Sequence, residues 1–427
     1  MAAQTPPERN RYVDFLRAVS ILVVVTGHWL IAGFYYDDGM VSVSSVLKTQ
    51  PQTQWLTWIF QVMPIFFIVG GYANAVSLDS AARRGLGYAE WLASRLNRLV
   101  TPLLVLIIGW AALSLALNFS PVAGTVIQAG SRAALIPIWF LAIYVIVVLL
   151  APATHRLWVR WGFLSFWAFV VLAGVVDFLF FVADLRLAGW SNYFWVWLAV
   201  HQLGYAWRAG RFDSAVRLLA GSAVAFAILY ALIVAGPYPL AMVGSPDPGL
   251  SNTLPPKITL VVLAIIQLGL LLAAERPMRR LLANQKAWAA TVLVNSMIMT
   301  LYLWHLTVMV LVVALAWLVG GAGLGLVPGT AEWWATRPLW IVFLYALLLP
   351  VTAVLSRFER LPRPADAPVP AAHRQVGGAV MLCLGVALLA RFGFGTTPIP
   401  GLDIAAFLFV VAGVGLSGLL PRIGRAA

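Results

Sequence analysis

The sequence predicts an all-α polytopic membrane protein with about 10–12 transmembrane helices and both termini in the cytoplasm. Of the 427 residues, 62% are hydrophobic and only 10% are charged. A soluble domain has about 45–50% apolar and about 25% charged residues, so this composition excludes a soluble globular protein and a disordered one. Apolar runs recur along the whole chain, and the cations gather between alternate runs. These observations give the fold class.

Each apolar run is close to the length of about 20 residues that a helix needs to cross a bilayer. In chain order the runs lie at about 12–34, 55–78, 99–119, 135–154, 163–184, 191–207, 214–236, 257–275, 291–319, 337–355, 376–395 and 400–420. The even number of runs places both termini on one side of the membrane. Helices are expected throughout, because backbone groups in lipid must be hydrogen-bonded within each span.

The linkers between the runs predict the domain organisation. Residues 1–355 are expected to form one unit of about ten helices, followed by a proline-rich cytoplasmic linker at 356–375. Residues 376–427 are expected to form an accessory C-terminal hairpin of two transmembrane helices. The first span is not expected to be a cleaved signal, because Asp14 and Arg17 interrupt it and no small-residue cleavage site follows.

The cations give the orientation. When the 28 Lys and Arg are sorted by alternate sides of the predicted spans, 22 fall on one side. Positive charge concentrates on the cytoplasmic side, so this side is predicted to be cytoplasmic. The asymmetry explains the net charge of +13 without a nucleic-acid partner. The single cysteine, Cys383, excludes an internal disulfide and a cysteine-based metal site.

The first span carries ionisable residues along one face. Arg17 and His28 are eleven residues apart, which is about 20° past three full helical turns and about 16 Å along the axis. Asp14 lies on nearly the same face. One interpretation is a functional stripe, because charged groups inside spans are costly and mark sites. The other is that Asp14 pairs with Arg17 at the interface while His28 bonds a neighbouring helix.

Two further ionisable residues fall at a similar predicted depth. His28, Asp177 and His305 each lie about 14–16 residues from the inner end of an outward-running span, which is about 21–24 Å. Three such groups at one depth indicate a polar cavity slightly beyond the midplane. Separate interhelical hydrogen bonds are the alternative.

The remaining candidates lie nearer the cytoplasm. His201 is predicted to be either a ligand or a packed interhelical histidine. Arg95 and Arg98 share a helix face, where they could hold phosphates or simply follow the positive-inside rule. His155 and His373 fall in predicted cytoplasmic loops and are expected to be exposed.

Motifs of other enzyme classes do not occur in the sequence. There is no GxxxxGK[ST] phosphate loop and no HExxH helix, so nothing indicates an ATPase or a zinc protease. No metal is therefore expected.

Five short motifs occur in order along the first nine spans. They are Arg17-x10-His28 after VDFLRAVSI, the segment FFIVGGY at 66–72, Arg95-Leu-Asn-Arg98 with Pro102, Trp139-Phe140-Leu141 with Tyr144, and Tyr302-Leu-Trp-His305. Together they resemble the membrane acyltransferase-3 family of bacterial integral-membrane O-acyltransferases. The stretch HQLGYAWRAGR is similar to actinobacterial members. Gly70 stands where this family usually has serine, which removes the hydroxyl but keeps a small residue for close helix packing.

The resemblance implies transfer of an acyl group, commonly acetyl, from cytosolic acyl-CoA to a hydroxyl of a cell-envelope glycan or glycolipid in the inner membrane. Acyl-CoA is the donor substrate and no metal is needed. Candidate donor-binding residues are Arg17, Tyr72, Arg95, Arg98 and His201.

Candidate catalytic residues are His28, Asp177 and His305. Neutral imidazole has an unperturbed pKa suited to taking a proton from a hydroxyl near neutral pH, and it can also be acylated. The sequence leaves open a direct transfer or an acyl-histidine intermediate. It also leaves open the acceptor, the acyl length and the oligomeric state. The alternative classes are a secondary transporter or flippase of an envelope lipid or sugar, whose polar residues would line a path, and a non-enzymatic envelope scaffold.

Overall fold

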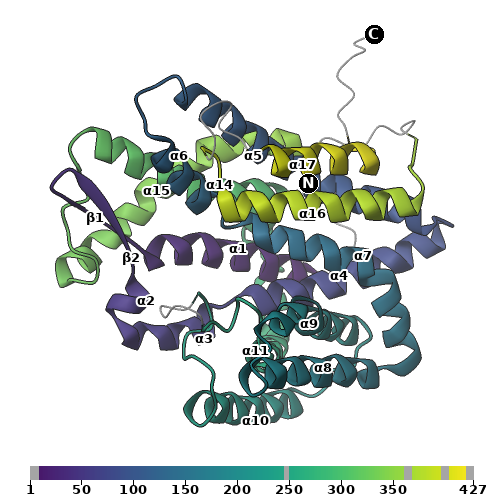
Figure 1. Ribbon diagram of the computed structural model, residues 1–427. Helices are drawn as coiled ribbons and strands as arrows, with labels where there is room; N and C mark the ends of the chain where they lie inside the picture. The colour runs from purple at the N-terminus through teal and green to yellow at the C-terminus, as the bar shows by residue number, and fades with distance from the viewer. Residues whose placement is uncertain (1–8, 245–249, 360–367, 396–402, 420–427) are drawn as a thin grey trace. The chain divides into compact units, whose positions relative to one another are not determined.

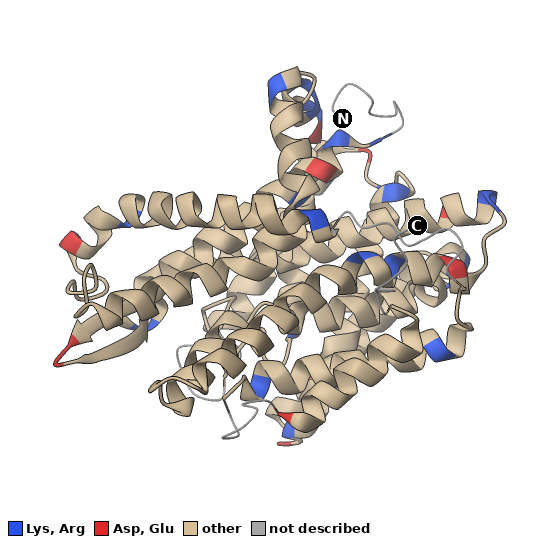
Figure 2. Cartoon of the chain, turned by 90° about the horizontal axis from the view of Figure 1, so that it is seen from above, with Lys and Arg blue, Asp and Glu red and all other residues tan. Residues whose placement is uncertain are grey.

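The structure confirms an all-α polytopic membrane protein. The computed structural model describes residues 9–244, 250–359, 368–395 and 403–419. A helix occupies each of the twelve predicted apolar runs within these residues (Figure 1). Charged residues lie mostly near helix ends and in connecting segments, as Figure 2 shows. The long uncharged stretches between them are the lengths that a bilayer accepts.

Nine helices in the described ranges are long and apolar enough to cross a membrane, and a pair bent by 54°, α11 with α12, raises the number to ten. Two helices at predicted runs are shorter: α9 (Asn192–Arg208), with 17 residues, and α17 (Ile404–Ser417), with 14. The polytopic architecture thus holds with about ten crossings. The cytoplasmic placement of the termini stays a prediction.

The chain forms two compact units. The first consists of Met1–Asp79, Ala151–Ser296 and Gly325–Arg337, and the second of Ser80–Leu150, Met297–Leu324 and Pro338–Ala427. Three helices contain a boundary between the units: α4 (Met63–Arg83), α7 (Ile138–Trp161) and α15 (Ala331–Glu359).

The first unit begins with α1 (Arg11–Ile31) and includes the bundle α8 to α11. Its other elements are β1 (Ala32–Asp37), β2 (Met40–Ser45), α2 (Val46–Thr49), η2 (Pro51–Leu56), α3 (Thr57–Phe60), α8 (Phe163–Phe181), η3 (Arg186–Ser191), α9, α10 (Ala215–Val234), α11 (Ile258–Ala273), α12 (Glu275–Leu281) and α13 (Gln285–Ser296). Within the bundle α9 is the buried helix: its side chains from Val196 to Trp207 are all buried.

A short hairpin follows α1 where the sequence predicts only a polar linker. Strands β1 and β2 pair antiparallel, with Ala32 opposite Ser45 and Asp37 opposite Met40. The two turn residues, Asp38 and Gly39, both have positive φ, of 44° and 83°. An Asp-Gly pair suits this two-residue turn, because aspartate tolerates and glycine favours the left-handed region.

The second unit contains α5 (Tyr88–Leu117), α6 (Gly124–Ala134), α14 (Ile298–Leu318), α16 (Ala372–Phe392) and α17. Helices α16 and α17 pack against each other, and the accessory hairpin of two transmembrane helices stays a prediction. Helix α16 also packs on α5 and α6, and Gln375 Nε2 donates to the carbonyl oxygen of Ala89 over 3.0 Å. The proposed boundaries of the hairpin and of the linker stay predictions, and residues 360–367 of that linker lie outside the described residues.

One predicted boundary is wrong. The expected ninth span at about 291–319 is broken at Met297, and the membrane-length helix α14 starts at Ile298. His305 is therefore the eighth residue of a 21-residue helix, whereas His28 is the eighteenth residue of α1, which also has 21. The equal-depth argument fails for His305, because the count from the inner end was seven residues too long.

Candidate active site

The start of α1 is an ion-paired segment. Asn10 caps the helix by accepting from the N–H groups of Tyr12 and Val13, which satisfies two of the first free donors. Buried Asp14 accepts from Arg9 Nε over 2.6 Å and lies 3.9 Å from Arg17 Nη1. The contact between Asp14 and Arg17 is one half of the alternative interpretation of this face; the functional stripe stays a prediction. The hydrogen bond to Asp14 raises the pKa of Arg9, so this guanidinium stays charged.

Arg17 keeps part of its side chain accessible. Its side chain is 26% exposed, against 8% for Asp14. The carbonyl oxygen of Asp14 accepts from Asn295 Nδ2 over 2.8 Å, and Arg11 Nη1 donates to the carbonyl oxygen of Leu282 over 3.0 Å. These bonds fix α1 against α12 and α13. They fix the backbone position from which Arg17 extends.

His28 lies in the last turn of α1, before the hairpin. The carbonyl oxygen of His28 accepts from the N–H of Ala32, and this bond ends the helix. His28 itself is partly exposed. Because α1 is continuous from Arg11 to Ile31, the eleven-residue spacing does place Arg17 and His28 on one face. The predicted stripe is thus a property of one uninterrupted helix.

The glycines of the FFIVGGY segment on α4 allow a close crossing with α9. A Cβ added at Gly71 would overlap the carbonyl oxygen of His201, and one added at Gly204 would lie 2.8 Å from the Cα of Gly71. Beside this crossing the rings of Phe67 and Trp197 stack, with centroids 4.3 Å apart. Small residues let helix backbones approach in membranes, so this motif joins two helices.

Tyr72 and His201 lie on either side of that crossing. The hydroxyl of Tyr72 accepts from Asn10 Nδ2 over 3.3 Å, which links α4 to the start of α1. His201 is fully buried, and its Nε2 lies 3.1 Å from Asn74 Nδ2. Within the described part of the chain its Nδ1 has no hydrogen-bond partner. This is the packed interhelical histidine that the sequence offered as one of two alternatives, and a role with the donor stays a prediction.

Asp177 is the centre of a hydrogen-bond network at the end of α8. Its carboxylate accepts from Asn192 Nδ2 over 2.8 Å, from Tyr238 Oη over 3.1 Å and from the N–H of Ile258 over 2.8 Å. One side chain therefore holds the start of α9, the segment after α10 and the start of α11. Burial raises the pKa of Tyr238, and the negative charge of Asp177 and the hydrogen bond to its carboxylate raise it further. The Tyr238 phenol therefore keeps its proton and remains a hydrogen-bond donor.

Lys257 lies next to this network, one residue before Ile258, and was not predicted from the sequence as a site residue. It is 1% exposed, and its Nζ lies 3.5 Å from the centroid of the Phe180 ring. Burial lowers the pKa of Lys257 to about 8, against the opposing effect of the Asp177 charge. The hydrogen bonds of Asp177 hold three segments of the chain together, which is a structural role. The catalytic role of Asp177 stays a prediction.

The Arg-x-x-Arg motif lies near the start of α5 in the second unit. The guanidinium of Arg95 is 5.9 Å from the centroid of the Trp91 ring, and its side chain is half-buried. Arg98 is exposed. A half-buried and an exposed guanidinium one turn apart can bind an anion together, because each presents planar donors.

Two of the motifs meet in the second unit. Buried Tyr302 donates its hydroxyl proton to the carbonyl oxygen of Pro137 over 2.7 Å, next to the Trp139-Phe140-Leu141 segment. The rings of Tyr302 and Phe140 pack edge to face with centroids 5.7 Å apart, and those of Phe140 and Tyr144 stack with centroids 5.9 Å apart. His305 Nδ1 lies 2.6 Å from the carbonyl oxygen of Tyr302, which leaves Nε2 as the other polar atom of this ring.

The structure thus groups the predicted site residues by unit. Arg17, His28, Tyr72, Asp177 and His201 belong to the first, and the others belong to the second. One lesser expectation is wrong: His155 lies inside α7 and is half-buried, because its ring packs against Tyr205 at 5.1 Å.

Sequence reasoning missed several polar residues near the candidates. Asn74, Asn192, Gln202 and Lys257 are buried, and Tyr238 is half-buried. The available signal was position: Asn192 opens a span and Lys257 stands directly before one. In the described ranges no group of three or more His, Cys, Asp or Glu side chains could hold a metal ion.

The fold and these motifs define a multi-pass membrane protein with arginine and histidine side chains on its helices. Comparison with protein families gives the class: an acyltransferase domain matches residues 10–357, and the chain belongs to the membrane acyltransferase-3 family. It is therefore a membrane acyltransferase that works in a lipid bilayer on an acceptor substrate. No curated protein and no solved structure matches the chain significantly.

Proposed function

We propose that this acyltransferase moves an acyl group, acetyl in the simplest case, from cytosolic acyl-CoA to a hydroxyl of a cell-envelope glycan or glycolipid. The protein would act in the inner membrane. Family membership supports the acyltransferase class. The finer assignment is supported by one observation above all: Arg17 and His28 share a face of the uninterrupted helix α1.

His28 is the proposed base. Its imidazole takes the proton of the acceptor hydroxyl while the hydroxyl oxygen attacks the thioester carbonyl carbon. The new C–O bond forms, the C–S bond breaks, and the leaving CoA thiolate takes the proton from the imidazolium. Histidine suits both transfers because its unperturbed pKa is near neutral. Its position three residues before the end of α1 supports contact with an acceptor at the outer side.

A second route uses the same residue. One imidazole nitrogen attacks the thioester carbonyl carbon, the C–S bond breaks, and the thiolate takes the proton of the other ring nitrogen and leaves as CoA thiol. The acceptor hydroxyl oxygen then attacks the acyl carbon, the C–N bond breaks, and the imidazole takes up the hydroxyl proton. Rapid-quench mass spectrometry of the protein separates the two routes, because only this one adds the acyl mass to the peptide containing His28.

Arginines are the proposed holders of the donor. The phosphates of acyl-CoA are anionic, and guanidinium groups bind phosphate through paired charge-assisted hydrogen bonds. On α5 Arg98 is exposed and Arg95 is half-buried one turn away, which supports donor binding by this pair. Arg17 on α1 is a separate candidate, because its side chain is 26% exposed.

The function is tested with the purified full-length chain in lipid nanodiscs. Acyl-CoA is added with an envelope glycolipid extract, and the release of CoA thiol and the mass of the acylated product are followed together. The acceptor is found by comparing envelope lipids and glycans of a deletion strain with those of the complemented strain. Loss of an acyl group from one glycan supports the proposal, whereas movement of an unmodified lipid with no thiol release supports a transporter.

A further inference from the structure

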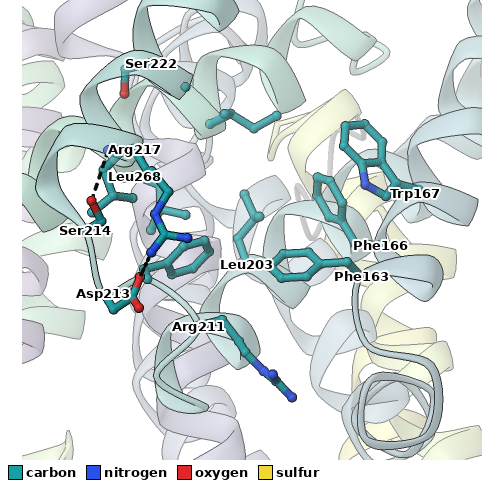
Figure 3. A pocket seen from close by; sticks show the side chains of 15 residues that line it. Phe163, Phe166, Trp167, Leu203, Arg211, Asp213, Ser214, Arg217, Ser222 and Leu268 are labelled. Atoms are coloured by element: carbon teal, nitrogen blue, oxygen red, sulfur yellow. Dashed lines mark hydrogen bonds and ion pairs between the residues drawn. The ribbon is translucent and has the colours of Figure 1, made fainter.

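A cavity in the first unit lies apart from the candidate site residues. It is formed by α8, α9, α10 and α11 near the connection from α9 to α10, and its volume is about 260 Å³. Figure 3 shows the aromatic side chains of Phe163, Phe166 and Trp167 on one side, with Leu203 between them and α10. The walls are predominantly apolar. A volume just below the usual lower limit of about 300 Å³ for ligand pockets suits part of one hydrocarbon chain.

The rim of this cavity carries cations. Arg211 and Arg217 both line it and both are exposed. Arg217 Nη2 lies 3.1 Å from Asp213 Oδ1, so one carboxylate partly neutralises one of the two guanidinium groups. The rim keeps a net positive charge. An apolar chamber with a positive rim is complementary to an amphiphile with an anionic head.

The flanking helices expose apolar side chains beside the cavity. On α8 Leu164 is 70% exposed and Trp167 is 53% exposed, and on α10 Val216 is 77% exposed. In a membrane protein such faces contact lipid chains. The cavity is therefore within reach of bilayer lipid, and the arginines stand at the side that the cation asymmetry assigns to the cytoplasm.

We propose that this cavity binds one phospholipid with an anionic headgroup, of the phosphatidylglycerol kind, from the cytoplasmic leaflet. Its acyl chain lies against Phe166 and Trp167, and its phosphate lies between Arg211 and Arg217. Basic pockets between transmembrane helices bind acidic lipid headgroups through the same combination of charge and apolar contact. This site is independent of the acyl-transfer proposal.

The test is lipid retention by the purified full-length chain, measured by native mass spectrometry. The protein is released from micelles that contain equal amounts of phosphatidylglycerol and phosphatidylcholine with identical chains. The wild type is expected to keep one phosphatidylglycerol molecule in preference to phosphatidylcholine. The Arg211→Gln/Arg217→Gln double variant is expected to bind it about tenfold more weakly, because each cation near a membrane surface contributes about fivefold and Asp213 already offsets one.

Two further variants make the result specific. An Arg156→Gln/Arg160→Gln variant removes two exposed arginines at the end of α7 and is expected to retain the lipid normally. Gly221 lines the cavity, and a Cβ there meets nothing within 4 Å. Gly221→Leu therefore fills space without removing charge, and it is expected to abolish retention while the protein stays folded.

Three outcomes would overturn the proposal. They are equal retention of the two lipids by the wild type, unchanged retention in Gly221→Leu, and equal loss in both double-arginine variants. Displacement of phosphatidylglycerol by an equimolar long-chain acyl-CoA would also overturn it, because the cavity would then belong to the donor.

Discussion

Replacing Gly204 with alanine tests whether the close crossing of α4 and α9 holds the first unit together. The added Cβ would lie 2.5 Å from the backbone nitrogen of Tyr72 and would overlap the carbonyl oxygen of Ile68. Ordinary van der Waals contact begins at 3.4 Å, so the backbones must separate by at least about 0.9 Å. Neither atom can move by a rotamer change, since both belong to helix backbone.

The energetic cost follows from that displacement. Overpacking a well-packed site costs about 1–3 kcal/mol, and a backbone–backbone clash belongs at the upper end. The same separation would pull apart the stacked rings of Phe67 and Trp197, whose centroids are 4.3 Å apart. We therefore expect Gly204→Ala to lower the free energy of unfolding by about 3 kcal/mol.

The assay is a reversible denaturing-detergent titration of the purified chain in mixed micelles. Gly221→Ala is the matched control, because it also places alanine in a helix but meets open space. That control should be neutral or stabilise by up to about 1 kcal/mol, as alanine favours helix over glycine. Equal stability of the two variants would refute the argument that glycine is required at this crossing.

Three further predictions concern the site and its orientation. Asp177→Ala should destabilise the fold by about 3 kcal/mol or more in the same titration, because it leaves three donors without an acceptor; full stability with lost activity would instead make Asp177 catalytic. Arg95→Gln/Arg98→Gln should weaken acyl-CoA binding more than tenfold by calorimetry, since charge-assisted bonds contribute about 1.5–3 kcal/mol each, and unchanged affinity would return both residues to a topological role. Residues 35–54 follow the first predicted span, which runs outward from a cytoplasmic N-terminus. A cysteine replacing Lys48 in a cysteine-free background should therefore react with an impermeant reagent added outside intact cells, and labelling only from the inside would contradict this topology.

The helices could be predicted because their signal is local. A run of about twenty apolar residues favours a helix by itself, so all twelve runs contain helices, although two of these helices are shorter than a full span. The break at Met297 was missed because the apolar run continues through it. Helix α6 was missed for the opposite reason, since its sequence GTVIQAGSRAA is amphipathic rather than apolar. The β1–β2 hairpin depends on a two-residue turn inside a polar linker, which a search for apolar length does not see.

Within the candidate site, the relative placement of two residues was predictable only when both lie on the same helix. Arg17 and His28 depend on spacing within α1, and the structure keeps that helix continuous. The partners of Asp177 come from separate segments, at Asn192, Tyr238 and Ile258, which only the folded chain brings together. A buried lysine such as Lys257 resembles any interfacial cation in the sequence. Its burial becomes evident only when the ring of Phe180 is found against it.

The central claim is that His28 takes the proton of the acceptor or receives the acyl group. His28→Gln keeps a hydrogen-bonding side chain of similar reach but cannot take up a proton near neutral pH. If the residue only bonded a neighbouring helix, this change would cost about 1 kcal/mol of stability and little activity.

The most direct measurement is the rate of acyl transfer from acyl-CoA by purified His28→Gln in nanodiscs, with acyl-CoA affinity and unfolding measured on the same sample. We predict a rate about 10²–10⁴-fold below that of the wild type, with folding and donor binding retained. His305→Gln, as a supporting group, should lose less. A folded His28→Gln protein that binds acyl-CoA and turns over at nearly the normal rate would contradict the account.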